Sequence, residues 1–160
     1  NRFARTFASL YPQHVDDLVL LASGGDFELN EEQIARLRDS FDLKLSDKER
    51  LQAIKRAFFA EGNDPNVWLD GWYPDLAAAQ VLSARMINGD FFKRAGGKDF
   101  LLIQAEEDFI APPEKAGRVL KSELPEQVTY VEIPNTGHAL SSERPDEIAA
   151  EIIKYFSRSR

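Results

Sequence analysis

Apolar runs and amphipathic stretches alternate at the two ends of the chain. The run at 18–22 is continuously apolar and is followed by Ser23 and two glycines. This pattern is typical of a strand in a parallel sheet that helices cover on both faces. Runs at 100–105 and 128–133 predict two further strands. Since helical segments lie between and beside these runs, the ends of the chain predict an α/β fold.

Three helices are expected beside these strands. The first ten residues have helical spacing, Pro112 opens a second helix that continues to about Leu124, and Pro145 opens the last. The expected apolar faces consist of Phe3, Ala4, Phe7 and Leu10 in the first helix and of Ile148, Ile152 and Phe156 in the last.

The middle of the chain carries helix signals and no strand signal. Two capping-box patterns, at Asn30 and Ser46, stand before apolar residues at helical spacing. Residues 61–74 are irregular, 76–87 are helical in composition, and the glycines within 89–97 predict a return loop. We therefore expect an α/β core formed by residues 1–25 and 98–160, with residues 26–97 inserted as a helical cap.

Composition narrows the class of protein. A chain of 160 residues with 43% hydrophobic residues can bury the core of one globular domain. The net charge of -7 disfavours nucleic acid as a partner, and no apolar run is long enough to cross a bilayer. The absence of cysteine excludes disulfides and thiolate metal sites, and no other cluster has metal-ligand spacing. These features are compatible with a cytoplasmic protein, which is the location we expect.

The start of the sequence is unusual. Residue 1 is Asn rather than Met, and a helix is predicted from the first residues onward. We therefore expect that the sequence begins within a fold. No signal-peptide pattern is visible.

His138 is the candidate catalytic base. The chain contains only two histidines, and His14 is expected to be exposed at the turn before the first strand, without a role. His138 directly follows the third predicted strand, and Asp108 follows the second. Because parallel strands end at the same edge of a sheet, both side chains should lie at the edge where α/β folds bind ligands.

Each of these residues also has an ordinary structural interpretation. A lone loop histidine is usually solvated, and an acidic trio such as Glu106, Glu107 and Asp108 usually caps a helix at the surface. The joint pattern is more informative than either part, since an acid followed by a histidine is the order found in hydrolases whose nucleophile comes first in the chain.

These segments resemble the C-terminal part of an α/β-hydrolase-fold protein. The sequence Gly137-His138, followed after four residues by Glu143 and then by Pro145, matches the pattern around the family's catalytic histidine. The resemblance implies that Asp108 is the acid and His138 the base of a catalytic triad. Ala105 departs from the glycine that many members have, although epoxide-hydrolase-like members also carry alanine there.

The nucleophile of such a triad is absent from the sequence. The nucleophile elbow is a sharp turn that needs small residues on both sides, as in Gly-x-Ser-x-Gly. Ser23 comes closest to this pattern, but Leu21 stands two residues before it. By the resemblance, the nucleophile is expected upstream of Asn1, and it could be Ser, Asp or Cys, or be lost.

Aromatic residues of the predicted cap and its return have two interpretations. They line an apolar slot for the substrate, or they form the core of the cap itself. The candidate substrate-binding residues are Trp68, Trp72, Tyr73 and Phe91.

We expect a hydrolase of the serine-esterase or epoxide-hydrolase kind, which acts on an ester or similar small apolar substrate without a cofactor. The alternative is a non-catalytic relative that binds a small apolar ligand under its cap. The sequence leaves the oligomeric state open.

Overall fold

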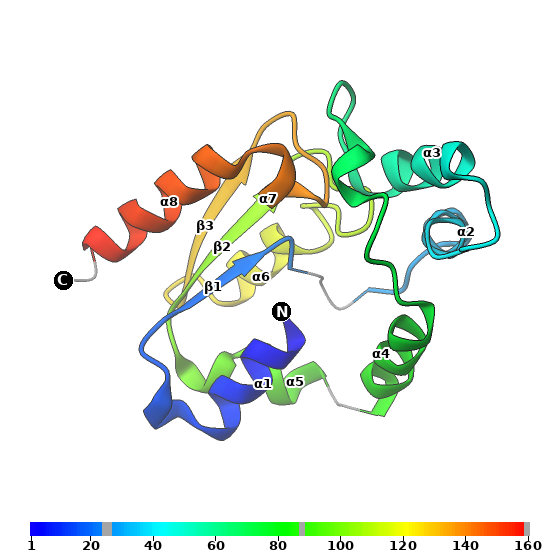
Figure 1. The fold of residues 1–160 in the computed structure, drawn as a ribbon. Helices are drawn as coiled ribbons and strands as arrows, with labels where there is room; N and C mark the ends of the chain where they lie inside the picture. The colour runs from blue at the N-terminus through cyan, green and yellow to red at the C-terminus, as the bar shows by residue number, and fades with distance from the viewer. Residues whose placement is uncertain (24–26, 87–88, 159–160) are drawn as a thin grey trace.

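A computed structural model describes residues 1–23, 27–86 and 89–158. The described sheet has three parallel strands in the order β1-β2-β3, with β1 at Leu18–Leu21, β2 at Phe100–Ala105 and β3 at Val128–Ile133 (Figure 1). Leu18 pairs with Phe100, which pairs with Val128. The predicted α/β fold is confirmed. The expected boundary between core and cap at residues 25 and 26 lies outside the described residues.

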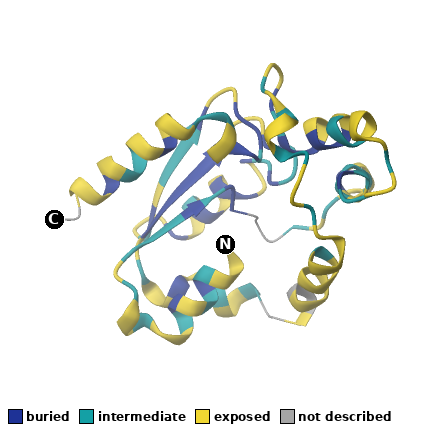
Figure 2. Ribbon diagram, viewed as in Figure 1, coloured by how far each residue is buried: buried dark blue, intermediate teal, exposed yellow. Residues whose placement is uncertain are grey.

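Helices cover both faces of the sheet. Helices α1 (Arg2–Leu10) and α6 (Gly117–Glu123) pack on one face, where Leu120 joins the cluster around Leu20 and Phe100. Helices α7 (Leu140–Glu143) and α8 (Pro145–Arg158) pack on the other. Every residue of β2 is buried, as Figure 2 shows, because β2 is paired on both sides and covered on both faces.

The middle of the chain, which we interpret as the insertion, is helical, as its pattern predicts. Helix α2 covers Glu31–Ser40 and α3 covers Asp47–Phe58, and each begins with the expected capping box, at Asn30 and at Ser46. A 3₁₀ turn, η2, follows at Pro65–Trp68, and α4 covers Pro74–Met86. The predicted end of that helix at Ile87 lies outside the described residues.

Two predicted segments differ in the structure. The return segment forms a short helix, α5 (Gly89–Lys93), and a 3₁₀ turn, η3 (Ala95–Gly97), rather than a loop. After Pro112 the chain makes hydrogen-bonded turns, and α6 begins only at Gly117 because Ala116 has non-helical backbone angles of φ -123° and ψ -91°. A proline pair marks the start of helical turns but does not fix where the regular helix begins.

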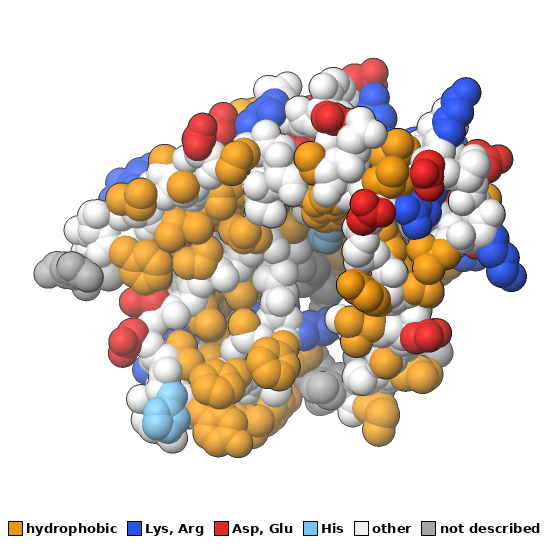
Figure 3. Space-filling view, viewed as in Figure 1, with side chains coloured by type: hydrophobic (Ala, Val, Ile, Leu, Met, Phe, Trp, Pro, Cys, Tyr) orange, Lys and Arg blue, Asp and Glu red, His pale blue; other side chains and the backbone are white. Residues whose placement is uncertain are grey.

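The apolar face predicted for the first helix is corrected by the structure, and that of the last helix is confirmed except at Phe156. In α1 the buried residues are Arg5 and Ala8, whereas Phe3 is 85% exposed and Phe7 and Leu10 are also exposed. In α8, Ile148 is buried and Ile152 packs against the same cluster, as predicted, but Tyr155 is buried in place of Phe156. Figure 3 shows hydrophobic side chains gathered at the surface over α1, beside α8 and over α4.

Specific long-range contacts explain why Tyr155 and Arg5 are buried. The Tyr155 hydroxyl donates a hydrogen bond of 2.7 Å to Asp17, and burial together with this carboxylate raises the pKa of Tyr155. The Arg5 guanidinium lies 4.9 Å from the centre of the Phe92 ring, and its burial lowers the pKa of Arg5 to about 10. Periodicity within one helix cannot show such partners, because they come from distant segments.

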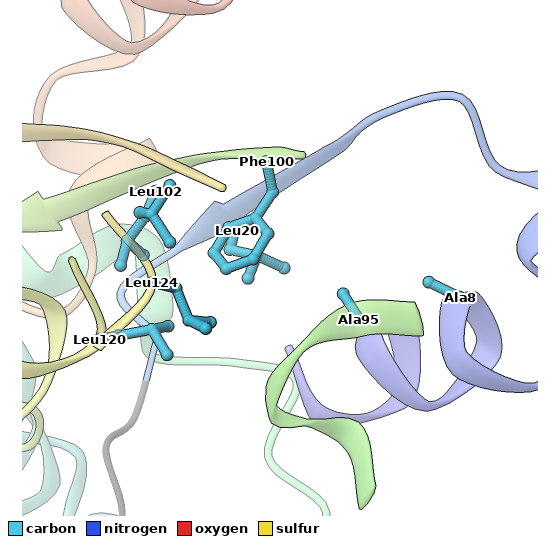
Figure 4. Packing of buried hydrophobic residues seen from close by; sticks show 8 residues of the cluster. Ala8, Leu20, Ala95, Phe100, Leu102, Leu120 and Leu124 are labelled. Carbon is cyan, nitrogen blue, oxygen red and sulfur yellow. The ribbon is translucent and has the colours of Figure 1, made fainter. Parts of the chain in front are cut away.

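The packing of α1 against η3 leads to a first prediction. Ala8 and Ala95 are fully buried, and Figure 4 shows them on neighbouring segments. A Cβ at Gly96 would lie 2.4 Å from the Ala8 carbonyl oxygen, and the φ of +65° also disfavours a side chain there. Gly96→Ala should therefore lower the free energy of unfolding by about 3 kcal/mol, measured by urea denaturation.

The adjacent Gly97 provides the matched control. Its φ of +82° is equally unfavourable for alanine, but nothing lies within 4 Å of a Cβ built there. Gly97→Ala should lower the free energy of unfolding by only about 1 kcal/mol, because the positive φ is its only unfavourable effect. If both variants lost the same free energy of unfolding, the result would contradict the close contact between η3 and α1.

Candidate active site

Asp108 is held at the carboxyl end of β2 by its own loop. Its Oδ1 accepts hydrogen bonds from the backbone N–H groups of Ile110 at 3.0 Å and Ala111 at 2.7 Å. The side chain is fully buried. Because short polar side chains readily accept bonds from backbone N–H groups two and three residues later, the sequence after β2 fixes the carboxylate locally.

Gln104 supports the same carboxylate from within the strand. Its Nε2 donates to Asp108 Oδ2 at 3.1 Å and to the Ala111 carbonyl at 2.8 Å, and the side chain is completely buried. Two acceptors on this nitrogen define which end of the amide faces the acid. Sequence reasoning missed this residue. The available signal was one polar side chain inside an otherwise apolar strand.

His138 lies next to Asp108, as the sequence predicts. The His138 Nδ1 atom is 2.9 Å from Asp108 Oδ2 and 3.0 Å from Oδ1. The two loops are also joined by backbone bonds from Glu106 N to the Ile133 carbonyl and from Glu107 N to the Thr136 carbonyl, both 3.0 Å. The predicted hydrogen bond therefore follows from adjacent parallel strands that end at the same edge.

This geometry prepares the histidine ring to act as a base. A carboxylate only accepts hydrogen bonds, so the Nδ1 atom facing it carries the proton of the neutral ring. The Nε2 atom then has a free lone pair, and no described residue makes a hydrogen bond to it. The His138 side chain is 26% exposed, and the Phe58 ring packs beside it with 5.9 Å between ring centres. The pair can accept a proton at Nε2 and stabilise the resulting imidazolium.

The predicted aromatic residues are not all brought together. Trp68, Trp72 and Tyr73 line a cavity of about 390 Å³ between η2 and the start of α4. Trp68 and Trp72 also pack against Phe58, and thus belong to the core of the insertion. Phe91 is half exposed on α5 and is not among the residues that line this cavity.

Another cavity lies far from the histidine. It has a volume of about 560 Å³ and is formed at the amino ends of the strands by polar residues that include Asp16, Asp99 and Glu126. Since ligands of α/β sheets bind at the carboxyl ends of the strands, we give this cavity no catalytic role.

The described part of the chain has neither a metal-binding cluster nor a membrane-spanning helix. No three side chains of His, Asp or Glu gather there in a way that could hold a metal ion. None of the helices in the same residues has the length and apolar character needed to cross a membrane.

Comparison with known proteins identifies the fold. No protein-family model and no curated protein sequence matches the chain. Solved structures do match, at probability 1.00 and identities of 16–21%. The chain has the α/β-hydrolase fold, with a partial sheet.

Three of the similar structures illustrate the match. A membrane phospholipase A, reported as a bacterial virulence factor, superimposes with a TM-score of 0.70 and 18% identity over 98% of this chain and 53% of its own. The 2-hydroxy-6-oxo-6-phenylhexa-2,4-dienoate hydrolase of a Rhodococcus species has a TM-score of 0.66 and 16% identity, and the match covers 95% of this chain and 59% of that one. An α/β-hydrolase enzyme from a deep-sea metagenome library has a TM-score of 0.62 and 16% identity, with 98% of this chain and 61% of that one covered. The chain thus spans between about half and three fifths of these structures.

Proposed function

We propose that this chain supplies the acid and the base of an ester-hydrolysing α/β-hydrolase whose nucleophile belongs to a segment outside this sequence. The observation that supports the proposal is the hydrogen bond between the buried Asp108 carboxylate and Nδ1 of His138. This bond leaves Nε2 of the ring available to accept a proton. The sequence contains no serine with glycine on both sides at the spacing of a nucleophile elbow, so the attacking group has to come from elsewhere.

Each residue has a defined part in the proposed reaction. His138 Nε2 takes the proton of the attacking hydroxyl, passes it to the leaving alcohol, and then activates the water that releases the acid. Asp108 keeps the ring in the required tautomer and stabilises its charged form. No cofactor takes part. An epoxide-hydrolase-like variant would use the same pair to activate water after attack by a carboxylate.

The surface of the chain beside β1 is suited to the docking of a further segment. In the described sheet β1 pairs with β2 alone, so no described strand pairs with its other edge, although the Leu21 carbonyl accepts a hydrogen bond from the Asn1 side chain at 2.8 Å. Exposed apolar side chains lie on the two helices nearest this edge: Phe3 and Phe7 on α1, and Ile153 and Phe156 on α8. An open edge flanked by apolar helix faces is a surface on which a further strand and helix pack.

The proposed substrate is a small apolar ester. Its acyl or alkyl part would contact Trp68, Trp72 and Tyr73, whose rings line the cavity of the insertion. Phe91 would contribute only if the substrate extended toward α5. The similar structures include a membrane phospholipase A and a 2-hydroxy-6-oxo-6-phenylhexa-2,4-dienoate hydrolase, which supports testing esters and related apolar acyl compounds first.

Activity measurements with a short-chain aryl ester test the proposal. The purified 160-residue chain should be inactive and prone to self-association, because it lacks a nucleophile and leaves apolar surface uncovered. Joining it to the upstream segment of its gene should give esterase activity. A monomeric, active 160-residue chain that loses activity in His138→Ala would show that the nucleophile lies within this sequence. A folded but inactive complete protein would instead favour a small-ligand-binding protein.

A further inference from the structure

The Glu143 carboxylate connects the histidine loop to the insertion. Its Oε2 accepts the backbone N–H of Gly137 at 2.8 Å, directly before the candidate base. Its Oε1 accepts the backbone N–H of Ala60 at 2.8 Å and the side-chain amide of Asn63 at 2.6 Å, just after α3. One side chain therefore receives three hydrogen bonds from two segments that are more than 70 residues apart in the sequence.

Neighbouring bonds join the same two segments. Ala139 N donates to the Phe58 carbonyl at 2.9 Å, and Asn63 Nδ2 donates to the Asn135 carbonyl at 3.2 Å. The backbones are also in direct contact, since a Cβ at Gly137 would lie 2.5 Å from the Phe58 carbonyl oxygen. The end of α3 and the histidine loop thus form one packed unit.

His138 lies inside this unit. Gly137 and Ala139, the residues on either side of it, are both bonded to the insertion or to Glu143. The Phe58 ring contacts the histidine ring on one side, and Asp108 holds Nδ1. The backbone that carries the ring therefore cannot move relative to α3 without breaking these bonds.

We propose that Glu143 is a positioning residue that locks the end of α3 to the loop of His138, so that the insertion and the base adopt their positions together. Its catalytic meaning rests on the proposed function, but the lock itself can be tested in the 160-residue chain without any turnover. In a complete hydrolase these bonds hold Phe58 beside the base.

Glu143→Gln is a sharp probe because it preserves the shape of the side chain. A glutamine must turn its NH₂ group either toward the Gly137 N–H or toward the donors of Ala60 and Asn63, so at least one bond is replaced by two facing donors. Glu147→Gln is the matched control. Glu147 is exposed in the first turn of α8, and it makes no hydrogen bond within the described residues.

Two measurements on the chain report the lock. Hydrogen exchange of the Gly137, Ala60 and Ala139 amides should become about tenfold faster in Glu143→Gln, with no change at the amides of β2. Imidazole ¹⁵N spectra should show shifted His138 signals and unchanged signals of His14, the other histidine. Glu147→Gln should match the unaltered chain in both measurements. If the effect of Glu143 were purely local, the exchange rate of the Ala139 amide and the ¹⁵N signals of the His138 ring would not change.

Asn63→Ala is the second variant if Glu143→Gln fails to fold. It removes one donor from the carboxylate, together with the bonds of Asn63 to the Asn135 carbonyl and to Arg144, but leaves the Gly137 and Ala60 bonds to Glu143 in place. It should therefore produce smaller changes, about threefold, at the same three amides and the same ring. Unchanged exchange at Ala139 together with unchanged His138 signals would overturn the lock. An intact lock in a complete protein without esterase activity would instead overturn the proposed function alone.

Discussion

Replacement of His138 by alanine should reduce ester turnover of the complete protein by about 10⁵- to 10⁶-fold. The ring is the only described base whose free nitrogen lies at the carboxyl edge of the sheet while its other nitrogen is fixed by a buried carboxylate. Without it, neither the attacking hydroxyl nor the hydrolytic water is deprotonated, and the leaving alcohol receives no proton. The rate constant kcat, measured with an aryl ester, gives the size of the loss.

His14 provides the control for this experiment. It is exposed in the 3₁₀ turn η1 (Pro12–His14), before β1, and has no contact with the site. His14→Ala should retain the turnover of the unaltered protein. The base assignment is wrong if His138→Ala stays within tenfold of that value while its circular dichroism spectrum is unchanged.

Asp108→Asn should lower kcat by about 10⁴-fold, although the side chain keeps its size. Oδ1 accepts two backbone N–H groups, so the asparagine oxygen has to occupy that position. Its NH₂ group then takes the place of Oδ2, where it faces the Gln104 amide and donates to His138 Nδ1. The ring is forced to carry its proton on Nε2, which is the wrong tautomer for a base.

Imidazole ¹⁵N spectroscopy distinguishes this explanation from misfolding. The unaltered chain should show the Nδ1–H tautomer of His138, and Asp108→Asn the Nε2–H tautomer. Glu106→Gln, a change of an exposed acid in the same loop, should alter neither the tautomer nor the turnover. An Nδ1–H tautomer in Asp108→Asn would contradict the proposed role of the acid.

Local patterns predicted the parts of the fold that depend on neighbouring residues. Short stretches of sequence predict the two capping boxes and the strands at 18–22, 100–105 and 128–133. The structure contains all of them, and the strand boundaries agree to within one residue. The Asp108–His138 bond was also predictable, because it needs only two adjacent parallel strands and a loop after each.

Features that depend on distant partners were not predictable. Ala8 in α1 packs against Gly96, and Tyr155 in α8 is bonded to Asp17, and neither partner lies in the helix concerned. Gln104 stands out in sequence only as a polar residue in an apolar strand, and Asn63 has no such signal, because the role of each comes from the carboxylate that it contacts in the folded chain. The pattern of one helix shows that an apolar face exists, but not which face finds a partner.

The register of the sheet also has a consequence for the order of folding. Phe100 pairs with Val128 across 28 residues, whereas Leu18 pairs with Phe100 across 82. Closing the longer loop costs about 1 kcal/mol more in chain entropy, so the β2–α6–β3 unit should form before β1 joins it. The acid and the base both follow strands of this early unit. The two strands that carry them can therefore align while the insertion is still unattached, and the later docking of α3 then fixes the His138 loop through Glu143.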